Sequence, residues 1–276
     1  VPLGKVFELS SKPGARKTIY LDFNGESLST SNFWVKHYRM PSTVTAYTID
    51  SDPTTFSNEE RRAIAWIWAQ VAEDYAPFDV NVTTKYPGNL ANTLGRSSAS
   101  DSTYGAHVVI TSDSRPAKVC NGGCSGIAFI GTFSHYKGKK YAGKIDNSNG
   151  RDYQPAWVFD GPQTTGQSAP YIADTASHEA GHNLGLLHSS TTSAEYYRGH
   201  KNWSPIMGTT MKRDGTYHPI SQWSNGHYPK ARHGTGKKAK KHTGHLAVIT
   251  KNGLAYRADE TGHTVKQAKL IRTGYI

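Results

Sequence analysis

Hydrophobic positions along the chain fall first into six short segments in which β-branched and aromatic residues concentrate between polar turn formers. This pattern is typical of β-strands. The first four segments are expected to form one sheet, and the last two are further strands. In chain order the segments are 17–25, 43–50, 78–85, 106–113, 126–133 and 155–161.

A helical period replaces the strand pattern in two places. In residues 57–75, Ser57 followed by Glu60 makes a capping box, which satisfies the first free amides of a helix. The apolar residues that follow recur at helical spacing and are expected to pack on the sheet as core: Ile64, Ile67, Trp68, Val71 and Tyr75. A second helix is predicted at about 170–185. Strands and helices in this order predict an α/β or α+β lobe.

After residue 190 the pattern weakens to short turns rich in Gly, Ser, Thr and basic residues, with weak helical signals at 219–224 and 244–252. We interpret this part as a small irregular lobe. The chain of 276 residues is long enough for two lobes that share a cleft. The prediction is a single domain, residues 1–276, with an N-terminal lobe at about 1–188 and a C-terminal lobe at about 189–276.

Composition and the N-terminal sequence indicate where the protein is located. Hydrophobic residues make up 36%, and no apolar run approaches the roughly 18 to 20 residues of a membrane span. The chain starts at Val1 and shows no signal peptide, which suggests a mature, processed form of a secreted protein.

The charge is strongly basic. The net charge is +11, and residues 230–242 contain Lys and Arg without any acid. A solvated, mobile basic loop explains this stretch, and a patch that binds an anionic surface is the alternative. No nucleic-acid-binding module is recognisable, so charge alone supports such a partner and none is expected.

Cys120 and Cys124 are too few for a disulfide scaffold and too widely spaced for a CxxC redox motif. We predict a short disulfide around Gly122 and Gly123, because glycine takes the positive φ that a tight loop demands. A pair of free thiols is the alternative. A zinc site at these two cysteines is disfavoured because no histidine pair lies nearby to complete the ligands.

The stretch HEAGHNLGLLH, residues 178–188, carries the candidate chemistry. On a helix His178 and His182 face the same way and can chelate one ion, with Glu179 beside it. Gly185 can end the helix in the left-handed conformation and return His188 as a third ligand. Three neutral nitrogens and one water make the open tetrahedral site of catalytic zinc, with Glu179 as general base.

Other polar residues carry weaker signals. His135, His200 and His218 each lack a second histidine at helical spacing, so we expect surface or hydrogen-bonded side chains. Asp50 and Asp52 offer hard oxygen ligands to a possible Ca²⁺, but acids that flank a helix at a turn explain them as well.

The stretch 178–188 matches HExxHxxGxxH, the zinc signature of the metzincin metalloproteases. Met207 in NWSPIMGTTM resembles the methionine of the family's Met-turn, with Met211 as the competitor. The segments YLDFNGES, WAQVAEDYAPFDVNVTTKYPG and SNGHY resemble the secreted bacterial branch of reprolysin-like metzincins, over most of residues 17–260.

The sequence departs from other metzincin branches at two positions, which limits the family ligands that can be assigned to this chain. Ser189 follows the third histidine, as in matrixin-like members, where adamalysin-like members have Asp. Thr209 stands where astacin-like and serralysin-like members place a tyrosine ligand, so we assign three protein ligands and a water.

The resemblance implies a metzincin-like α+β fold with a zinc cleft between the lobes. It implies a monomeric, secreted zinc endopeptidase that acts on proteins or peptides. It also implies that residues 126–133 form the edge strand of the cleft, with the residues nearest substrate being Gly126, Ile127, Ala128 and Phe129. The alternatives are an ordinary edge strand there and a catalytically silent protein of the same fold that binds anionic surfaces.

Overall fold

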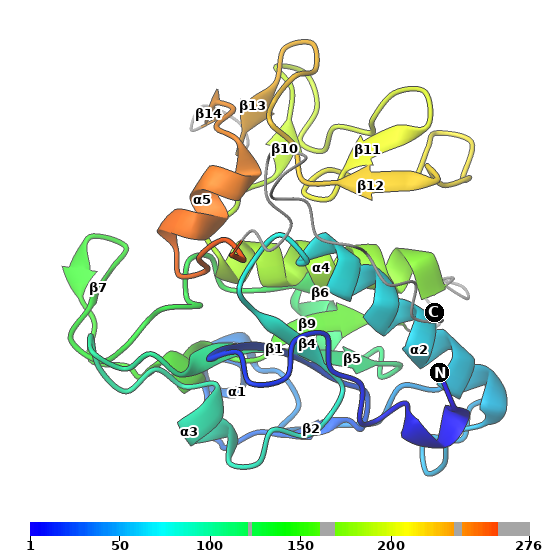
Figure 1. Cartoon of the computed structure of the whole chain (residues 1–276), viewed down its shortest axis with the longest axis vertical. Helices are drawn as coiled ribbons and strands as arrows, with labels where there is room; N and C mark the ends of the chain where they lie inside the picture. The colour runs from blue at the N-terminus through cyan, green and yellow to red at the C-terminus, as the bar shows by residue number, and fades with distance from the viewer. Residues whose placement is uncertain (121–122, 161–168, 235–238, 259–276) are drawn as a thin grey trace, which may run out of the picture.

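A five-stranded sheet organises the first two thirds of the chain. The computed structural model describes residues 1–120, 123–160, 169–234 and 239–258. The sheet has the order β4-β1-β5-β9-β6, and its first four strands are parallel. β6 pairs antiparallel with β9 at the edge (Figure 1). The strands are β1 Lys17–Asp22, β4 Asn81–Thr83, β5 Tyr104–Thr111, β6 Gly126–Ile127 and β9 Ala156–Phe159. The predicted α+β class is confirmed.

The central strand is buried along its whole length. All eight residues of β5 are buried, and β1 pairs with it from Lys17↔Tyr104 to Asp22↔Val109. Strands covered on both faces carry runs of consecutive apolar residues, as residues 108–110 do here.

The expectation that residues 43–50 belong to this sheet is wrong. Only β3, Thr43–Val44, is a strand there, and it pairs with β2, Glu26–Ser27, in a separate antiparallel ladder. The rest of the segment finds other partners: the Tyr47 amide donates to the Phe23 carbonyl, and the Thr48 amide donates to Ser112 Oγ.

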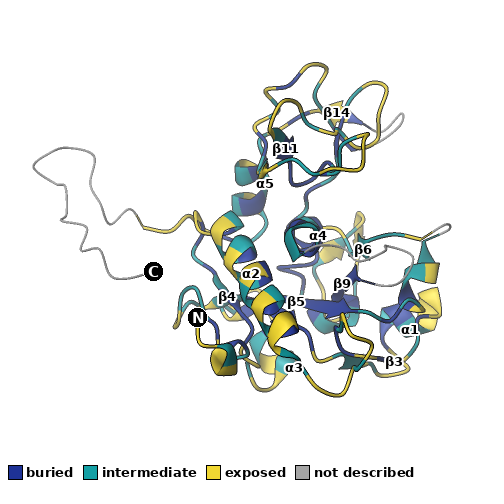
Figure 2. Cartoon of the chain, turned by 90° about the vertical axis from the view of Figure 1, so that its right-hand side faces the viewer, coloured by how far each residue is buried: buried dark blue, intermediate teal, exposed yellow. Residues whose placement is uncertain are grey.

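Two helices cover the same face of the sheet (Figure 1). α2, Asn58–Asp74, begins with the predicted capping box of Ser57 and Glu60. α4, Ala169–Asn183, matches the second predicted helix. The predicted core stripe of α2 is confirmed at Ile64, Ile67, Val71 and Tyr75, while Trp68 is half-buried. Figure 2 shows that α2 keeps an exposed face, whereas α4 is buried around most of its surface. The side chains of α4 therefore face protein rather than water.

A second apolar cluster lies on the other face of the sheet. It joins Trp34 of α1, Phe33–Tyr38, to Trp157 and Phe159 of β9. Sequence patterning missed α1 and α3, Leu90–Thr93, because helices of six and four residues show too little periodicity. The remaining small elements before α4 are 3-10 helices Leu3–Lys5, Pro116–Val119 and Gly150–Tyr153 and the hairpin of β7 Lys140–Tyr141 and β8 Lys144–Ile145.

Short strands and one helix follow α4 and lie above it in Figure 1. They are β10 Ser189–Ser190, β11 Trp203–Pro205, β12 Ile220–Gln222, β13 Arg232–His233, β14 Lys240–Lys241 and α5 His245–Lys251. The helix expected at 244–252 is confirmed. The helical signal at 219–224 is wrong, because Ile220–Gln222 pairs in parallel with Trp203–Pro205.

The basic stretch 230–242 is more than a loop. Arg232–His233 pairs antiparallel with Lys240–Lys241 and with Ser189–Ser190. Residues 235–238, residues 259–276 of the predicted C-terminal lobe, and Gly161 at the end of the last predicted strand lie outside the described residues. Among the described residues, no helix is long and apolar enough to cross a bilayer.

Candidate metal centre and cleft

Three histidine side chains converge at the C-terminal half of α4. His178 and His182 lie one turn apart on the helix, and His188 approaches from the chain that follows it. The Nε2 atom of His182 lies 3.1 Å from Nε2 of His178 and 3.2 Å from Nε2 of His188. The residues that the sequence singled out as ligands are thus brought together in a group that could hold a metal ion.

Hydrogen bonds at the opposite nitrogen set the tautomer of two of these rings. His178 Nδ1 lies 2.8 Å from the carbonyl oxygen of Ile206, and His182 Nδ1 lies 2.7 Å from that of Leu186. A carbonyl oxygen only accepts, so each Nδ1 donates and each Nε2 presents a lone pair. His188 Nδ1 faces the exposed carboxylate of Glu195 at 3.6 Å.

This arrangement fits a tetrahedral zinc ion. Lone pairs that face one another at 3.1–3.2 Å repel unless a cation lies between them. Ligand nitrogens at about 2.0–2.1 Å from a tetrahedral zinc ion are about 3.3–3.4 Å apart, close to the separations found here. Backbone carbonyls behind metal-binding imidazoles are the usual second layer of such sites.

Gly185 makes the turn that returns the chain to the centre, as predicted. Its φ is +87°, the left-handed region that favours glycine. Around it, the Gly185 amide donates to the His182 carbonyl and the Leu186 amide donates to that of Gly181. These bonds occupy the last carbonyls of α4 and carry the chain toward His188.

Met207 is fully buried against the metal-facing helix. A Cβ atom placed on Gly181 would lie 2.8 Å from the Met207 sulfur, so the methionine occupies space that a side chain at 181 would fill. The same turn supplies the Ile206 carbonyl that orients His178, and the Met207 carbonyl accepts from the Ser189 amide. The turn thus contacts both ends of the metal-binding stretch, at His178 and at Ser189.

Glu179 lies beside the triad, with 5% of its surface exposed. Its Oε2 atom is buried and has no hydrogen-bond partner among the described residues. The Glu179 side chain faces β6, where the missing side chain of Gly126 leaves room for its Cγ and Oε1 atoms. A buried carboxylate oxygen without a donor is ready to accept a proton from a bound molecule.

Burial shifts the pKa values of all four groups toward their neutral forms. Desolvation lowers the pKa of His178, His182 and His188 to about 3, and repulsion between the rings adds to this effect. The three ligands are therefore neutral at pH 7, as metal binding requires. Desolvation also raises the pKa of Glu179 well above its ordinary value.

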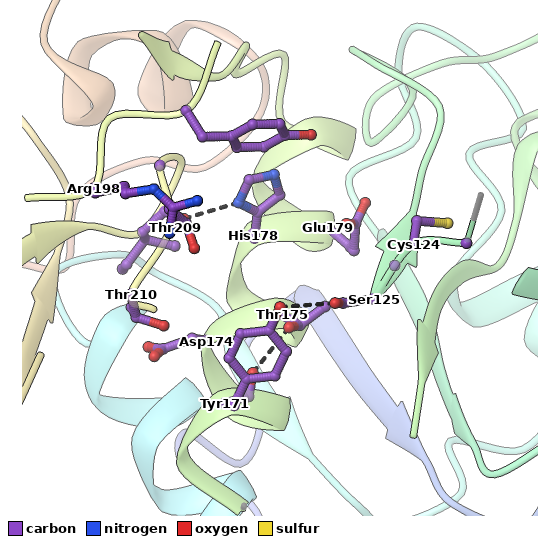
Figure 3. Close-up of a pocket in the computed structure, with 15 residues that line it drawn as sticks. Cys124, Ser125, Tyr171, Asp174, Thr175, His178, Glu179, Arg198, Thr209 and Thr210 are labelled. Carbon is purple, nitrogen blue, oxygen red and sulfur yellow. Dashed lines mark hydrogen bonds between the residues drawn. The ribbon is translucent and has the colours of Figure 1, made fainter. Parts of the chain in front are cut away.

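A cavity of about 320 Å³ opens next to His178 and Glu179. Figure 3 shows Ser125 and Cys124 on the side of Glu179, with Arg198, Thr209 and Thr210 opposite. Tyr171, Asp174 and Thr175 lie further back along α4. Tyr196 also lines the cavity, and its ring lies 4.2 Å from that of His188, centroid to centroid. The cavity can therefore hold a side chain of a molecule bound at the triad.

The predicted edge strand is shorter than expected. Gly126 and Ile127 pair with Val158 and Trp157, but residues 128–133 leave the sheet. The Gly131 and Phe133 amides donate instead to the His182 and Asn183 carbonyls at the end of α4, and the His182 carbonyl accepts from both Gly131 and Gly185. All four residues predicted to contact substrate, Gly126, Ile127, Ala128 and Phe129, are half-buried. β6 is the terminal strand of its sheet, so one of its edges is unpaired there.

The predicted disulfide between Cys120 and Cys124 is confirmed. It lies next to β6, and Cys124 lines the cavity. The bridge therefore closes a small loop at the side of the candidate site.

The weaker candidates do not join the metal centre. His135 is buried, contrary to a surface position, with Nε2 3.4 Å from Asp146. His200 is exposed and bonded to the Tyr197 hydroxyl, and His218 is half-buried. Asp50 and Asp52 accept hydrogen bonds from their own loop and belong to no group of three ligands among the described residues. They give calcium no support.

Sequence reasoning missed a second cluster of ionisable groups, Asp22, Glu26 and His107. Asp22 Oδ2 lies 3.0 Å from His107 Nε2, while Glu26 Oε2 lies 3.2 Å from His107 Nδ1. Arg151 Nη1 approaches the same Nδ1 at 3.4 Å. The two carboxylates flank opposite nitrogens of one ring, which is the arrangement of a buried ionic network. Sequence reasoning also missed Asp174. This residue stands four positions before His178, so the two side chains share one face of α4.

Comparison with known proteins finds a family model that matches the part of the chain holding this site. A family model described as "Metallo-peptidase family M12B Reprolysin-like" matches residues 62–189. None of the curated proteins compared with the chain matches it. The matched segment runs from within α2 through β4, β5, β6, β9 and α4 to Ser189, so it includes all three histidines and Glu179. The predicted resemblance is confirmed there, because residues 62–189 match the model of a reprolysin-like metallopeptidase family.

Proposed function

We propose that this protein is a zinc-dependent endopeptidase in which His178, His182 and His188 hold the metal and Glu179 is the general base. One observation carries the proposal: three Nε2 atoms meet beside a buried carboxylate oxygen that has no donor among the described residues. The match to a metallopeptidase family supports it.

When bound, zinc supplies a Lewis acid that polarises the scissile carbonyl and lowers the pKa of water to about 7. Glu179 accepts the proton of the attacking water at its free Oε2 and hands it to the leaving amine. The raised pKa of Glu179 makes its carboxylate a stronger acceptor for the proton of the attacking water. Met207 supports the floor of the centre, since its sulfur packs against Gly181 between the two helical ligands.

In this proposal the substrate peptide binds along β6. An extended peptide adds to the unpaired edge of a sheet through backbone hydrogen bonds. Gly126 and Ile127 supply that edge, followed by Ala128 and Phe129. A peptide bound there runs past Glu179, because Gly126 touches it.

We also propose that the chain works outside the cell as a monomer, with a cleft between lobes at about 1–188 and 189–276. The Cys120–Cys124 disulfide supports secretion, since such bonds persist in oxidising surroundings. A bacterial source rests on the sequence resemblance alone.

The test is hydrolysis of casein by the wild type and by Glu179→Gln, with bound zinc quantified in both. We expect the wild type to cleave, o-phenanthroline to abolish cleavage, and the variant to keep zinc but lose about 10² to 10⁴-fold in rate. Glu73→Gln, an exposed glutamate on α2, is the matched control and should retain full activity. If the wild type binds zinc but cleaves no peptide, a silent protein that binds anionic surfaces becomes the better explanation.

A further inference from the structure

The cavity beside the metal centre contains an acidic group. Asp174 lines it together with His178 and Glu179, and its carboxylate lies beside Thr210 in Figure 3. Asp174 stands one helical turn before His178, about 6 Å along the axis of α4. A side chain that enters from the metal centre therefore reaches Asp174 if it is about as long as lysine.

Among the described residues, the hydrogen-bond partners of the Asp174 carboxylate are all neutral. Its Oδ1 accepts from Gln70 Nε2 and from the Ser221 hydroxyl, and the Thr210 hydroxyl also interacts with it. A carboxylate offers about four acceptor positions, so these three donors leave capacity for another. None of the ion pairs within residues 1–120, 123–160, 169–234 and 239–258 involves Asp174.

A desolvated carboxylate without a positive partner favours a cation. Asp174 is 9% exposed, so water compensates little of its charge. Among the described residues that line the cavity, Arg198 is the one lysine or arginine, but it is exposed and donates through Nη1 to the Met211 carbonyl. Water and salt screen a charge in that position, whereas they screen Asp174 poorly.

We propose that Asp174 makes the cavity a specificity pocket for a cationic substrate residue, lysine or arginine, next to the scissile bond. This inference rests on the proposed peptidase function. Uptake of an acidic residue by Arg198 is the competing outcome, and Asp174 opposes it because both side chains line one cavity.

The experiment uses three peptides that differ only at the residue flanking one cleavage site: lysine, norleucine or glutamate. Norleucine keeps the four-carbon chain of lysine without its charge. We expect the wild type to prefer lysine over norleucine by at least about 10-fold in kcat/KM, with glutamate the poorest substrate. In Asp174→Asn the preference should fall below about 2-fold, since the amide oxygen still accepts from Gln70 and Ser221 but carries no charge.

Asp214→Asn, at an exposed carboxylate outside the cavity wall, is the control and should keep the wild-type preference. The wild-type ratio decides the matter even if Asp174→Asn fails to fold. Casein cleavage with a lysine-to-norleucine ratio near 1, or with glutamate preferred, overturns the pocket assignment and leaves the peptidase intact. A zinc-loaded wild type that cleaves neither casein nor any of the peptides overturns the proposed function itself.

Discussion

Gly126 on β6 and Glu179 on α4 are in such close contact that there is no room for a side chain at position 126. A Cβ atom on Gly126 would lie 2.7 Å from both Cγ and Oε1 of Glu179, and 2.7 Å from the Trp157 carbonyl oxygen. Real Cβ atoms do not approach other atoms so closely. The absence of a side chain at 126 therefore sets the position of the proposed general base relative to the edge strand.

Gly126→Ala should consequently lower kcat/KM by about 10 to 100-fold while zinc content stays near one ion per chain. The reason is that misplacing a catalytic group by about 1 Å costs about this much. Gly4→Ala is the control, because nothing lies within 4 Å of a Cβ there. Peptide kinetics and metal analysis on both variants measure the effect. Wild-type kcat/KM in Gly126→Ala would show that the contact does not position Glu179.

Gly185→Ala should weaken zinc binding and destabilise the fold by about 1–2 kcal/mol. Alanine at a φ of +87° is strained, and the Cβ would also lie 2.8 Å from Asn252 Nδ2. Relief of that strain would displace His188. Urea unfolding and zinc titration measure the two effects. Gly88→Ala, at a φ of +82° with open space around its Cβ, should cost similar stability without changing zinc affinity. Equal zinc affinities in the two variants would contradict this account of the turn.

Removing the metal should lower the Tm by about 5–15 °C. Without a cation the Nε2 lone pairs repel at 3.1–3.2 Å, and a ligand at about 1,000 times its Kd contributes about 4 kcal/mol. Calorimetry before and after dialysis against EDTA tests this, with recovery of the Tm when zinc is restored. His188→Gln should respond much less to EDTA. A Tm that EDTA leaves unchanged in the wild type would argue that the histidines hold no metal.

Acid should destabilise the part of the chain that holds His233, His242 and His245. Desolvation lowers the pKa of His242 to about 4 and lowers those of the other two, whose rings pack on it. In the unfolded chain their pKa is about 6.5. Between pH 6.5 and 4 the unfolded state therefore binds more protons, and the free energy of unfolding falls as the pH falls.

We expect His242 alone to contribute a loss on the order of 1 kcal/mol at pH 5, after allowing for screening by water that reaches part of this cluster. Thermal unfolding at pH 7 and pH 5, with zinc in excess, should show a drop in Tm that is smaller by a few degrees in His242→Gln. Because metal loss affects both proteins alike, the difference between them isolates His242. Identical drops would remove His242 from the explanation.

Local sequence patterns predicted α2 and α4, the two helices that cover one face of the sheet. The capping box at Ser57 and Glu60, the stripe through Ile64, Ile67 and Val71, and the extent of α4 all follow from helical geometry within one segment. The strand at 43–50 and the helix at 219–224 failed for the opposite reason. Tyr47 bonds to Phe23, and Ile220 pairs with Trp203, so partners distant in sequence determine those conformations.

That His178 and His182 share a helix face, and that Gly185 can turn the chain toward His188, was predictable from the residue spacing alone, because these relations depend on 3.6 residues per turn and on glycine's backbone freedom. The surroundings of these residues were not predictable in this way. The contact of Gly126 with Glu179, the Met207 sulfur against Gly181, and the neutral partners of Asp174 all join segments from different elements. Packing between elements depends on side-chain volumes and burial across the whole molecule, and no local period along the chain encodes it.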